Sequence, residues 1–230
     1  MNYSKLTTKN NNFIKRFSHS RRFITTSKII SKFKSNKILD YGSGNGELYK
    51  YLDKSKKKNF YFYEPNILMT KELKYNLKRY KINKIFTKPS EIYNNYFDLI
   101  CINEVFEHLN NIEQKKVLKH LRKISKAKCI ILISIPIEVG FSSIFKNVIR
   151  IITGQKHKNT NLKNLLKSLF YIKLKRSNKK YNDSHIGFNY LDFIKFLKKN
   201  KIKIFNVYYS PINFLRGLLN SQIFITAEFL

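Results

Sequence analysis

Apolar residues follow two alternating spacings along this chain, and the alternation predicts strands and helices in turn. Short apolar runs bounded by polar and turn residues predict strands at 37–41, 58–64, 83–88, 97–103 and 128–135. Apolar residues three and four positions apart predict helices at 21–34, 46–54, 67–80 and 110–126. Strands that alternate with helices are typical of an α/β fold built on a parallel sheet.

The C-terminal part of the chain predicts one more helix and two more strands. The helix is expected at 188–199, and the strands at 202–210 and 222–229. Because the connection 211–221 is too short for a crossover helix of the usual length, the last two strands should form an antiparallel hairpin. The sequence therefore predicts a doubly wound, Rossmann-like α/β sheet of seven strands. Its last strand is antiparallel, and helices cover both of its faces.

A long segment separates the fifth predicted strand from the last helix. A crossover needs only about a dozen residues, whereas about 137–182 lie in this connection, so we interpret it as a helical insertion after the fifth strand. Apolar side chains at 139–152 fall on one helical face, with Lys146 and Arg150 off it, and 162–174 has the same character. Such helices could pack as a lid over the substrate or lie on an anionic membrane through 139–152, and both interpretations stay open.

The length and composition suit one domain. With 230 residues, of which 43% are apolar, we expect a single domain at 21–230 and a basic N-terminal arm at 1–20. No apolar run reaches the roughly 18 residues of a spanning helix, and the first residues lack the apolar stretch of a signal peptide. Cys101 and Cys129 lie in predicted strands without C-x-x-C spacing, which favours reduced thiols in the cytoplasm over a disulfide or zinc site.

A glycine-rich turn follows the first predicted strand, in the segment Lys37-Ile-Leu-Asp-Tyr-Gly-Ser-Gly-Asn-Gly-Glu47. Gly42, Gly44 and Gly46 have no side chains, so the backbone can turn tightly there and approach a bound ligand closely. The dinucleotide-binding pattern needs G-x-G-x-x-G, but here Glu47 occupies the position of its third glycine. The turn therefore predicts a loop for a nucleotide cofactor other than NAD.

Glu64 ends the aromatic strand that follows this loop. A carboxylate at the end of the second strand can accept hydrogen bonds from both hydroxyls of a ribose, and each charge-assisted bond is worth about 1.5–3 kcal/mol. We therefore expect Glu64 to bind the ribose of the cofactor. The alternative is a solvated acid in a surface loop.

Three segments of the chain match one family in the same order. The run Asp40-Tyr-Gly-Ser-Gly-Asn-Gly46 resembles motif I of the class I S-adenosylmethionine-dependent methyltransferases, and Glu64 takes the place of that family's ribose-binding acid. Residues 96–109, Tyr-Phe-Asp-Leu-Ile-Cys-Ile-Asn-Glu-Val-Phe-Glu-His-Leu, resemble the fourth strand and following loop of its type 11 and type 12 members. The resemblance implies S-adenosylmethionine as cofactor and S-adenosylhomocysteine as product. The residues it implies for cofactor binding are Asp40, Gly42, Gly44, Gly46, Glu64, Asn103 and Glu104.

Two histidines are candidates for a catalytic base. His108 lies in the loop after the fourth strand, and His185 lies in a stretch that resembles the one before the last crossover helix of type 11 and type 12 methyltransferases. A neutral imidazole with a pKa near about 6.5 can take a proton from an attacking hydroxyl if it reaches the transferred methyl group. Alternatively, His185 is a polar residue of a loop that leads into a helix, and 107–108 are a helix start with a surface acid. No metal ligand set is expected.

The formal net charge of +32, from 46 basic and 14 acidic residues, would attract polyanions or an anionic membrane surface. The lysines are nevertheless dispersed among Asn, Ile, Phe and Tyr, as AT-rich coding would produce. The position after the fourth strand has neither the proline-containing run of base N-methyltransferases nor a nucleophilic cysteine. We therefore expect an O- or C-directed small-molecule acceptor before a nucleic acid. The two cysteines favour a cytoplasmic location, and contact with the inner face of the membrane is left open.

The resemblance implies methyl transfer by direct in-line displacement. The expected acceptor is a small molecule, a sugar or a lipid-linked intermediate, and RNA methylation is the runner-up because of the charge alone. A hypothesis of another class is a non-catalytic protein that binds polyanions or membranes and keeps the methyltransferase fold. The intact loop glycines and Glu64 oppose that hypothesis.

Overall fold

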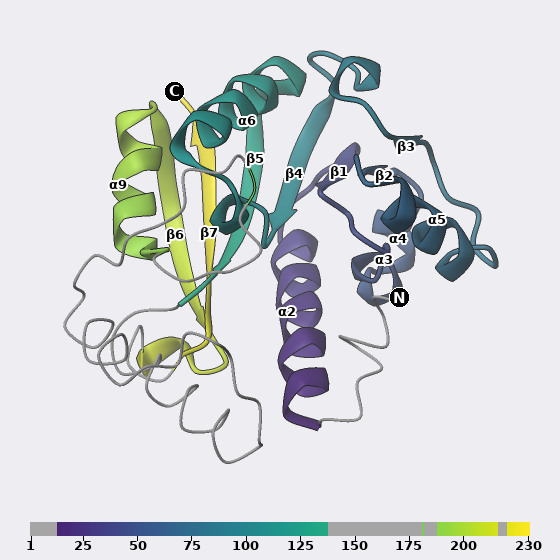
Figure 1. Ribbon diagram of the computed structural model, residues 1–230, viewed down its shortest axis with the longest axis horizontal. Helices are drawn as coiled ribbons and strands as arrows, with labels where there is room; N and C mark the ends of the chain where they lie inside the picture. Colours follow the sequence, from purple (N-terminus) through teal and green to yellow (C-terminus); the bar gives the residue numbers. More distant parts are fainter. Residues whose placement is uncertain (1–12, 138–180, 182–187, 216–219) are drawn as a thin grey trace.

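The protein, seen in a computed structural model, is built around one seven-stranded sheet with the order β3-β2-β1-β4-β5-β7-β6 (Figure 1). The structure describes residues 13–137, 181, 188–215 and 220–230. The strands are β1 (Ile38–Tyr41), β2 (Phe60–Tyr63), β3 (Ile85–Phe86), β4 (Phe97–Asn103), β5 (Ser125–Pro136), β6 (Ile202–Ser210) and β7 (Gln222–Phe229). Strands β1 to β5 are parallel, whereas β7 runs antiparallel to β5 and β6. The predicted fold class, the C-terminal hairpin and the antiparallel last strand are confirmed.

Strand β1 lies between β2 and β4, and its register decides which side chains meet at the edge of the sheet. Asp40 of β1 pairs with Phe62 of β2 on one side and with Cys101 of β4 on the other. The carboxyl ends of these three strands therefore lie close together, and the strand order reverses at β1. Open α/β sheets bind their ligands outside the carboxyl ends of the strands at such a reversal.

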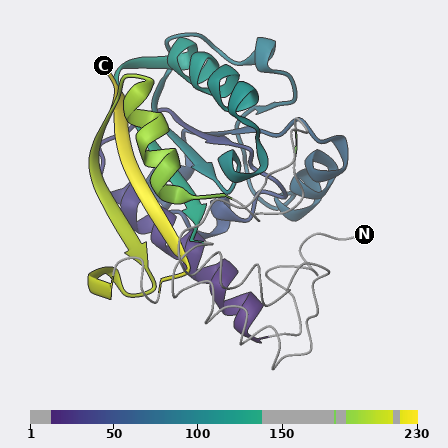
Figure 2. The same ribbon diagram turned by 60° about the vertical axis from the view of Figure 1, so that its left-hand side comes forward.

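Helices cover both faces of the sheet (Figures 1 and 2). They are α2 (Phe13–Ser31), α3 (Leu48–Tyr51), α4 (Lys54–Lys57), α5 (Ile67–Asn76), α6 (Asn111–Ile124) and α9 (Tyr190–Lys199), with 3-10 turns η1 (Pro89–Glu91), η2 (Phe106–His108) and η3 (Asn213–Leu215). Helices α2, α3 and α5 bury Ile30, Leu48 and Leu73 in one core cluster. Helices α6 and α9 bury Leu121 and Leu197 in a second cluster. The parallel strands are thus covered on both faces, as all-parallel sheets usually are.

Several predicted helices have different bounds in the structure; α5, for example, ends at Asn76 rather than at 80. Helix α2 begins at Phe13, inside the segment that was expected to be a basic arm, because the apolar residues at 13, 14 and 17 continue the helical spacing of 21–31. The single helix expected at 46–54 is two short helices, α3 and α4. The backbone is extended between them, with ψ of 149° at Leu52 and 153° at Asp53. Asp53 occupies the N-cap position of α4, a position that Asp favours.

Several predictions fall outside the described residues. Residues 1–12 of the expected arm, almost all of the insertion at 137–182, and His185 belong to this group. Both the lid interpretation and the membrane interpretation of 139–152 therefore remain predictions. Within the described residues, no helix combines the length and the apolar character that crossing a bilayer requires.

Asparagine side chains cap the N-terminal ends of helices α5, α6 and α9. Asn66 accepts hydrogen bonds from the backbone N–H groups of Leu68 and Met69 at the start of α5. Asn110 accepts one from Glu113 in α6, and Asn189 accepts one from the first turn of α9. Each bond satisfies one of the backbone donors that a helix start leaves without an intrahelical partner. The asparagine-rich composition thus supplies the local signals that start helices next to the expected site.

Gln114 fastens the loop after β4 to helix α6. Its side chain is buried, and Nε2 donates hydrogen bonds to the carbonyl oxygens of Phe106 at 2.9 Å and of Leu109 at 3.2 Å. These carbonyls lie in and directly after η2, the turn that carries His108. The position of this turn therefore depends on a side chain from the neighbouring helix.

We predict that Gln114→Leu lowers the free energy of unfolding by about 1–3 kcal/mol, because two carbonyl groups lose their donor while the apolar volume is kept. Urea unfolding followed by circular dichroism measures this. Lys115→Leu, on the exposed side of the same helix, is the matched control and should change stability by less than about 0.5 kcal/mol. Equal effects of the two substitutions would contradict the role assigned to Gln114.

Candidate active site

The glycine-rich loop joins β1 to α3, and all three of its glycines have positive φ: 82° at Gly42, 54° at Gly44 and 76° at Gly46. A Cβ on Gly42 would lie 2.5 Å from Cγ2 of Val105, and one on Gly46 would lie 2.9 Å from Cγ of Leu73. A Cβ on Gly44 would meet no heavy atom of the described residues within 4 Å. The loop is therefore packed against the protein at its two ends, and its middle glycine faces open space.

Glu64 lies beside that open space. Its Oε2 accepts a hydrogen bond from the backbone N–H of Gly44 at 2.7 Å, and its Oε1 accepts one from the N–H of Asn66 at 2.8 Å. Burial raises the pKa of Glu64, and these two backbone bonds oppose the rise. The residue is only 7% exposed, so it is not the solvated loop acid that the sequence left as an alternative. Each oxygen retains a further lone pair for a ligand hydroxyl.

Asp40 is buried in β1 directly before the loop. Burial raises the pKa of its carboxyl to about 7, and the nearby charge of Glu64 adds to the rise. The Cys101 thiol, 3.6 Å away, and the side chains of Asn103 and Arg22 favour the ionised form. With a pKa of about 7, the Asp40 carboxyl is partly protonated at neutral pH. A positively charged ligand beside it would favour the ionised form.

Asn103, the last residue of β4, is held by two hydroxyl groups. Its Oδ1 accepts hydrogen bonds from Oγ1 of Thr26 at 2.9 Å and from Oγ of Ser134 at 3.0 Å. Its amide nitrogen lies near enough to Asp40 to affect that pKa, yet it has no hydrogen-bond partner within the described part of the chain. A buried donor without a partner is costly, and a ligand carbonyl or carboxylate at this edge would satisfy it.

Glu104 follows Asn103 with a φ of 51°, a conformation that is uncommon outside glycine. Its backbone N–H donates to the carbonyl of Ser134 at 3.0 Å. Its carboxylate forms an ion pair with Arg22 of α2 and accepts a hydrogen bond from Nε2 of Gln222, the first residue of β7. Three elements that are distant in the sequence therefore meet at this side chain.

Of the two candidate histidines, the described residues include only His108. His108 lies in η2 and stacks on the ring of Tyr181, with centroids 5.1 Å apart and planes 12° from parallel. Its neighbour Glu107 is fully buried, so the interpretation of this acid as a surface residue is wrong. Helix α6 lies close to this turn, since Gln114 donates to the carbonyl oxygens of Phe106 and Leu109 on either side of Glu107 and His108. His185 lies outside the described residues, and its role stays a prediction.

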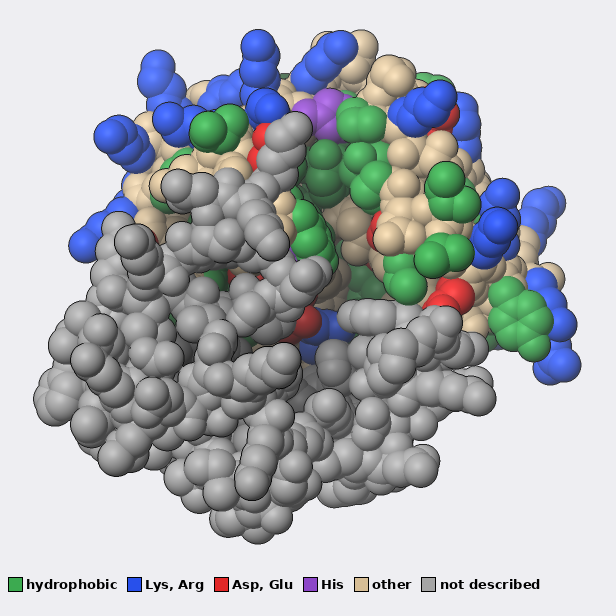
Figure 3. Space-filling model, viewed as in Figure 1, with side chains coloured by type: hydrophobic (Ala, Val, Ile, Leu, Met, Phe, Trp, Pro, Cys, Tyr) green, Lys and Arg blue, Asp and Glu red, His purple; other side chains and the backbone are tan. Residues whose placement is uncertain are grey.

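Five of the predicted elements of the site therefore meet at one edge of the sheet: the glycine loop, Glu64, Asp40, Asn103 and Glu104. Figure 3 shows this side of the molecule, hollowed near its centre, with acidic and basic side chains visible in the hollow. Sequence reasoning missed Arg22, Thr26 and Gln222, because none of them belongs to a motif near the others in sequence. Among the described residues, no three side chains of His, Cys, Asp or Glu are placed to share a metal ion.

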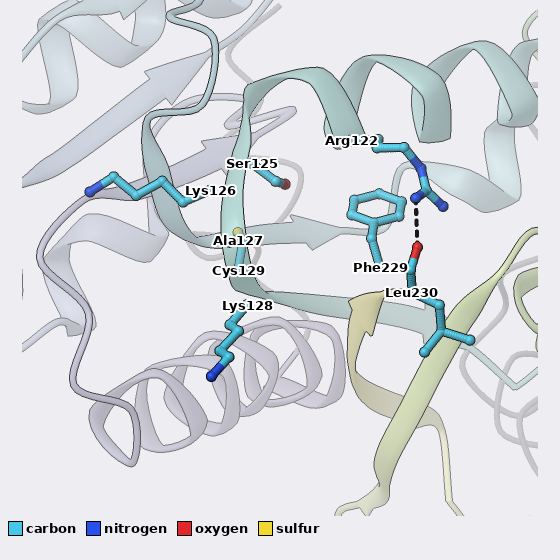
Figure 4. A pocket seen from close by; sticks show the side chains of 8 residues that line it. All are labelled: Arg122, Ser125, Lys126, Ala127, Lys128, Cys129, Phe229 and Leu230. Atoms are coloured by element: carbon cyan, nitrogen blue, oxygen red, sulfur yellow. Dashed lines mark hydrogen bonds between the residues drawn. The ribbon is translucent and has the colours of Figure 1, made fainter.

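A separate cavity of about 210 Å³ lies at the opposite edge of the sheet, where β5 begins (Figure 4). Arg122, Lys126 and Lys128 contribute to its lining, and Nη1 of Arg122 donates to the carbonyl oxygen of Leu230 at 2.8 Å. It contains none of the predicted site residues. The carboxyl edge remains the candidate site because the glycine loop, the buried acids and the unpartnered amide are all there.

Comparisons with known proteins agree with this geometry. The family described as "Methyltransferase domain" matches residues 13–167, which is well over half of the chain. No protein with a curated description matches. The crystal structure of the PH0226 protein from Pyrococcus horikoshii OT3 is similar with a TM-score of 0.63 and 11% identity, over 99% of this chain and 96% of that one.

Two further solved structures share the fold. The methyltransferase domain of bacterial CtHen1 has a TM-score of 0.58 and 15% identity, over 91% of this chain and 98% of that chain. Magnesium protoporphyrin IX methyltransferase (ChlM) from Synechocystis PCC 6803, with bound S-adenosylhomocysteine, has a TM-score of 0.59 and 13% identity, over 96% and 89%. With its strand order, its glycine loop and the family match, the chain belongs to the methyltransferase-domain family and is a class I S-adenosylmethionine-dependent methyltransferase.

Proposed function

We propose that this enzyme binds S-adenosylmethionine along the carboxyl ends of β2, β1 and β4 and transfers its methyl group to a small-molecule, sugar or lipid-linked acceptor by in-line displacement. The observation that carries the cofactor part is the open space at Gly44 directly beside the Glu64 carboxylate. The loop backbone can approach a ligand there, and Glu64 can accept hydrogen bonds from ribose hydroxyls.

The other end of the cofactor carries an α-ammonium and an α-carboxylate. We assign the ammonium to the neighbourhood of Asp40, whose buried carboxyl is only partly compensated by Arg22, and the carboxylate or a carbonyl to the amide donor of Asn103. Glu104 follows Asn103 directly after β4 and is ion-paired with Arg22 beside this part of the proposed site. The bound cofactor supplies an activated methyl group on a sulfonium.

The protein's main contribution to rate is the alignment of two reactants. Positioning of this kind can supply about 7–11 kcal/mol of the barrier, so a strong acid or base is not required. His108, which stacks on Tyr181 beside η2, and His185 are kept as candidates to receive the acceptor's proton. The contact of 139–152 with a membrane surface and a cytoplasmic location at its inner face belong to the same proposal.

RNA methylation is the second candidate function. The charge of +32 favours a polyanionic acceptor, and lysines lie over exposed tyrosine rings, as Lys78 does over Tyr75 at 4.7 Å from the ring centroid. The alternative of another class is that this chain binds polyanions or membranes without catalysing a reaction. Such a protein would keep these surface features but would lack affinity for S-adenosylhomocysteine. Cofactor titration therefore separates it from both enzyme hypotheses.

We predict that the wild-type protein binds S-adenosylhomocysteine in calorimetry and that Glu64→Ala weakens the affinity by about tenfold or more, since one charge-assisted bond is worth about 1.5–3 kcal/mol. Glu113→Ala, which removes an acid from the surface ion pair with Lys116, is the control and should bind like wild type. No binding to the folded wild-type protein would refute the proposed function.

Alanine at two of the loop glycines should impair the protein in two different ways, one through cofactor binding and one through stability. Gly44→Ala meets open space, so it should cost only about 1–2 kcal/mol of backbone strain while placing a methyl group where the cofactor lies. Its affinity for S-adenosylhomocysteine should fall far more than its stability. Gly46→Ala meets Leu73 and Leu77, so unfolding should be the main effect. Calorimetry and thermal melting of both variants test this contrast, and similar behaviour of the two would contradict it.

Asp40 predicts a pH dependence of cofactor binding. Its pKa is about 7 without ligand, and a positive ligand favours the ionised carboxylate, so binding releases a proton wherever Asp40 is protonated. Affinity for S-adenosylmethionine should therefore rise up to about tenfold from pH 6 to about pH 8 and then level off. Calorimetry in buffers of different ionisation enthalpy counts the released proton. Asp40→Asn should bind more weakly and without this dependence; an unchanged pH profile in the variant would exclude Asp40 as its source.

A further inference from the structure

Helix α5 carries three large apolar side chains on the side that faces solvent. Ile67, Leu68 and Tyr75 are 70%, 68% and 66% exposed, whereas Leu73 and Leu77 of the same segment are buried in the core. The first and the last of the exposed three lie only about 12 Å apart along the helix axis. Apolar residues that gather on one exposed surface mark an interaction site, whereas scattered ones need no explanation.

Basic side chains lie between the apolar ones. Lys71, Lys74 and Lys78 are all exposed, and Nζ of Lys78 lies 4.7 Å from the centroid of the Tyr75 ring. The acid of this helix, Glu72, is only partly exposed. Figure 3 shows hydrophobic and basic side chains side by side over α5, at the right of the view. We call this surface the α5 patch, and it consists of Ile67, Leu68, Lys71, Lys74, Tyr75 and Lys78.

The α5 patch begins beside the proposed cofactor site. Helix α5 follows Glu64 after two residues, and the N–H of its cap residue Asn66 donates to the Glu64 carboxylate at 2.8 Å. Its inner side packs against the glycine loop, where a Cβ on Gly46 would lie 2.9 Å from Cγ of Leu73. A surface bound to the outer side of α5 would therefore hold the rim of the site close to that surface.

We propose that the α5 patch docks this enzyme on an anionic lipid bilayer. Ile67 and Leu68 insert at the boundary between headgroups and acyl chains, Tyr75 lies at the headgroup level, and the lysines contact the negative headgroups. A nucleic acid would match the lysines and the tyrosine, but its phosphates offer nothing to two aliphatic side chains. The two aliphatic residues therefore favour the bilayer. The inference rests on the proposed function in one respect, because a docked site would meet a lipid-linked acceptor.

The general positive charge of the protein does not single out this surface, so the test needs a matched surface elsewhere. Helix α6 provides it. Ile112 is 66% exposed there, and Lys115, Lys119 and Lys123 are exposed on the same helix. This helix thus has the same number of exposed lysines available for substitution but a single exposed aliphatic residue.

The first experiment measures sedimentation with vesicles of phosphatidylcholine that contain about 30% phosphatidylserine. Wild-type protein should bind them and should bind vesicles of phosphatidylcholine alone much more weakly. The double variant Ile67→Ser/Leu68→Ser should lose about tenfold or more in affinity, because burial of one aliphatic side chain is worth about that much. Ile112→Ser should stay within about twofold of wild type.

Two triple variants remove the same charge from different helices. They are Lys71→Gln/Lys74→Gln/Lys78→Gln on α5 and Lys115→Gln/Lys119→Gln/Lys123→Gln on α6. The variant on α5 should lose about tenfold or more in affinity for the mixed vesicles. The variant on α6 should lose about threefold at most, since charges far from the membrane are screened. Equal losses would show that the overall charge binds the vesicles, and they would overturn the proposal.

A single tryptophan gives a direct readout of insertion, because the chain contains none. When the mixed vesicles are added, the emission of Leu68→Trp should shift to shorter wavelength, and lipids with brominated acyl chains should quench it. Ile112→Trp should show neither change. If Leu68→Trp sediments with the vesicles while its emission stays unchanged, Leu68 does not insert and the proposal is wrong.

Three further results would overturn the proposal. The mixed vesicles fail to bind wild-type protein, substitutions in the α5 patch weaken binding of a uridine oligonucleotide but not of vesicles, or Ile67→Ser/Leu68→Ser converts a dimer to a monomer in analytical ultracentrifugation. The second result would assign the patch to a nucleic acid, and the third would assign it to a second copy of the chain.

Failure of the proposed function looks different from failure of this proposal. The α5 variants should melt like wild type and bind S-adenosylhomocysteine within about twofold of it, because the exposed side chains do not contact the cofactor loop. Wild-type protein that binds the mixed vesicles through the α5 patch but does not bind S-adenosylhomocysteine would support the docking surface and refute the methyl transfer.

Discussion

The parallel pairing of β1 with β2 on one side and with β4 on the other is the constraint on which the site depends. It brings together the ends of three strands that are separated by helices in the sequence, with Asp40 level with Phe62 and Cys101. Each strand then continues into a different polar loop at the same edge. A shift of one residue in either pairing would turn Asp40 to the other face of the sheet and separate it from Asn103.

The same arrangement buries several charged side chains near the carboxyl edge of the sheet. Asp40, Glu64, Glu107 and Arg22 are each less than 9% exposed, in a protein whose surface is dominated by lysine. Burying a charged group costs free energy unless it is paired or hydrogen-bonded. Two backbone donors compensate Glu64, and Arg22 compensates Glu104. Asp40 is compensated less well, which is why its pKa rises to about 7. A buried carboxylate whose negative charge is only partly compensated favours the binding of a positively charged ligand group, and such perturbed groups are common at functional sites.

Helix α2 links stability to the site. It buries Ile29 and Ile30 in the core, while Arg22 and Thr26 bind Glu104 and Asn103 at the end of β4. The helix cannot shift without disturbing both Asn103 and Glu104. Methyl transfer depends on alignment more than on acid or base strength, and a packed helix that holds both Asn103 and Glu104 in place provides such alignment.

Much of the fold and the cofactor loop was determined by the sequence alone, because these features depend on local rules. Apolar periodicity predicted the strands and most helices, and glycine spacing with Glu64 predicted the loop. The division of 46–54 into two helices and the burial of Glu107 were not predicted, since both depend on contacts with distant segments. The same holds for the ion pair of Arg22 with Glu104 and the bond from Gln222, 118 positions away. No local pattern specifies such pairs, and only the tertiary structure brings them within bonding distance.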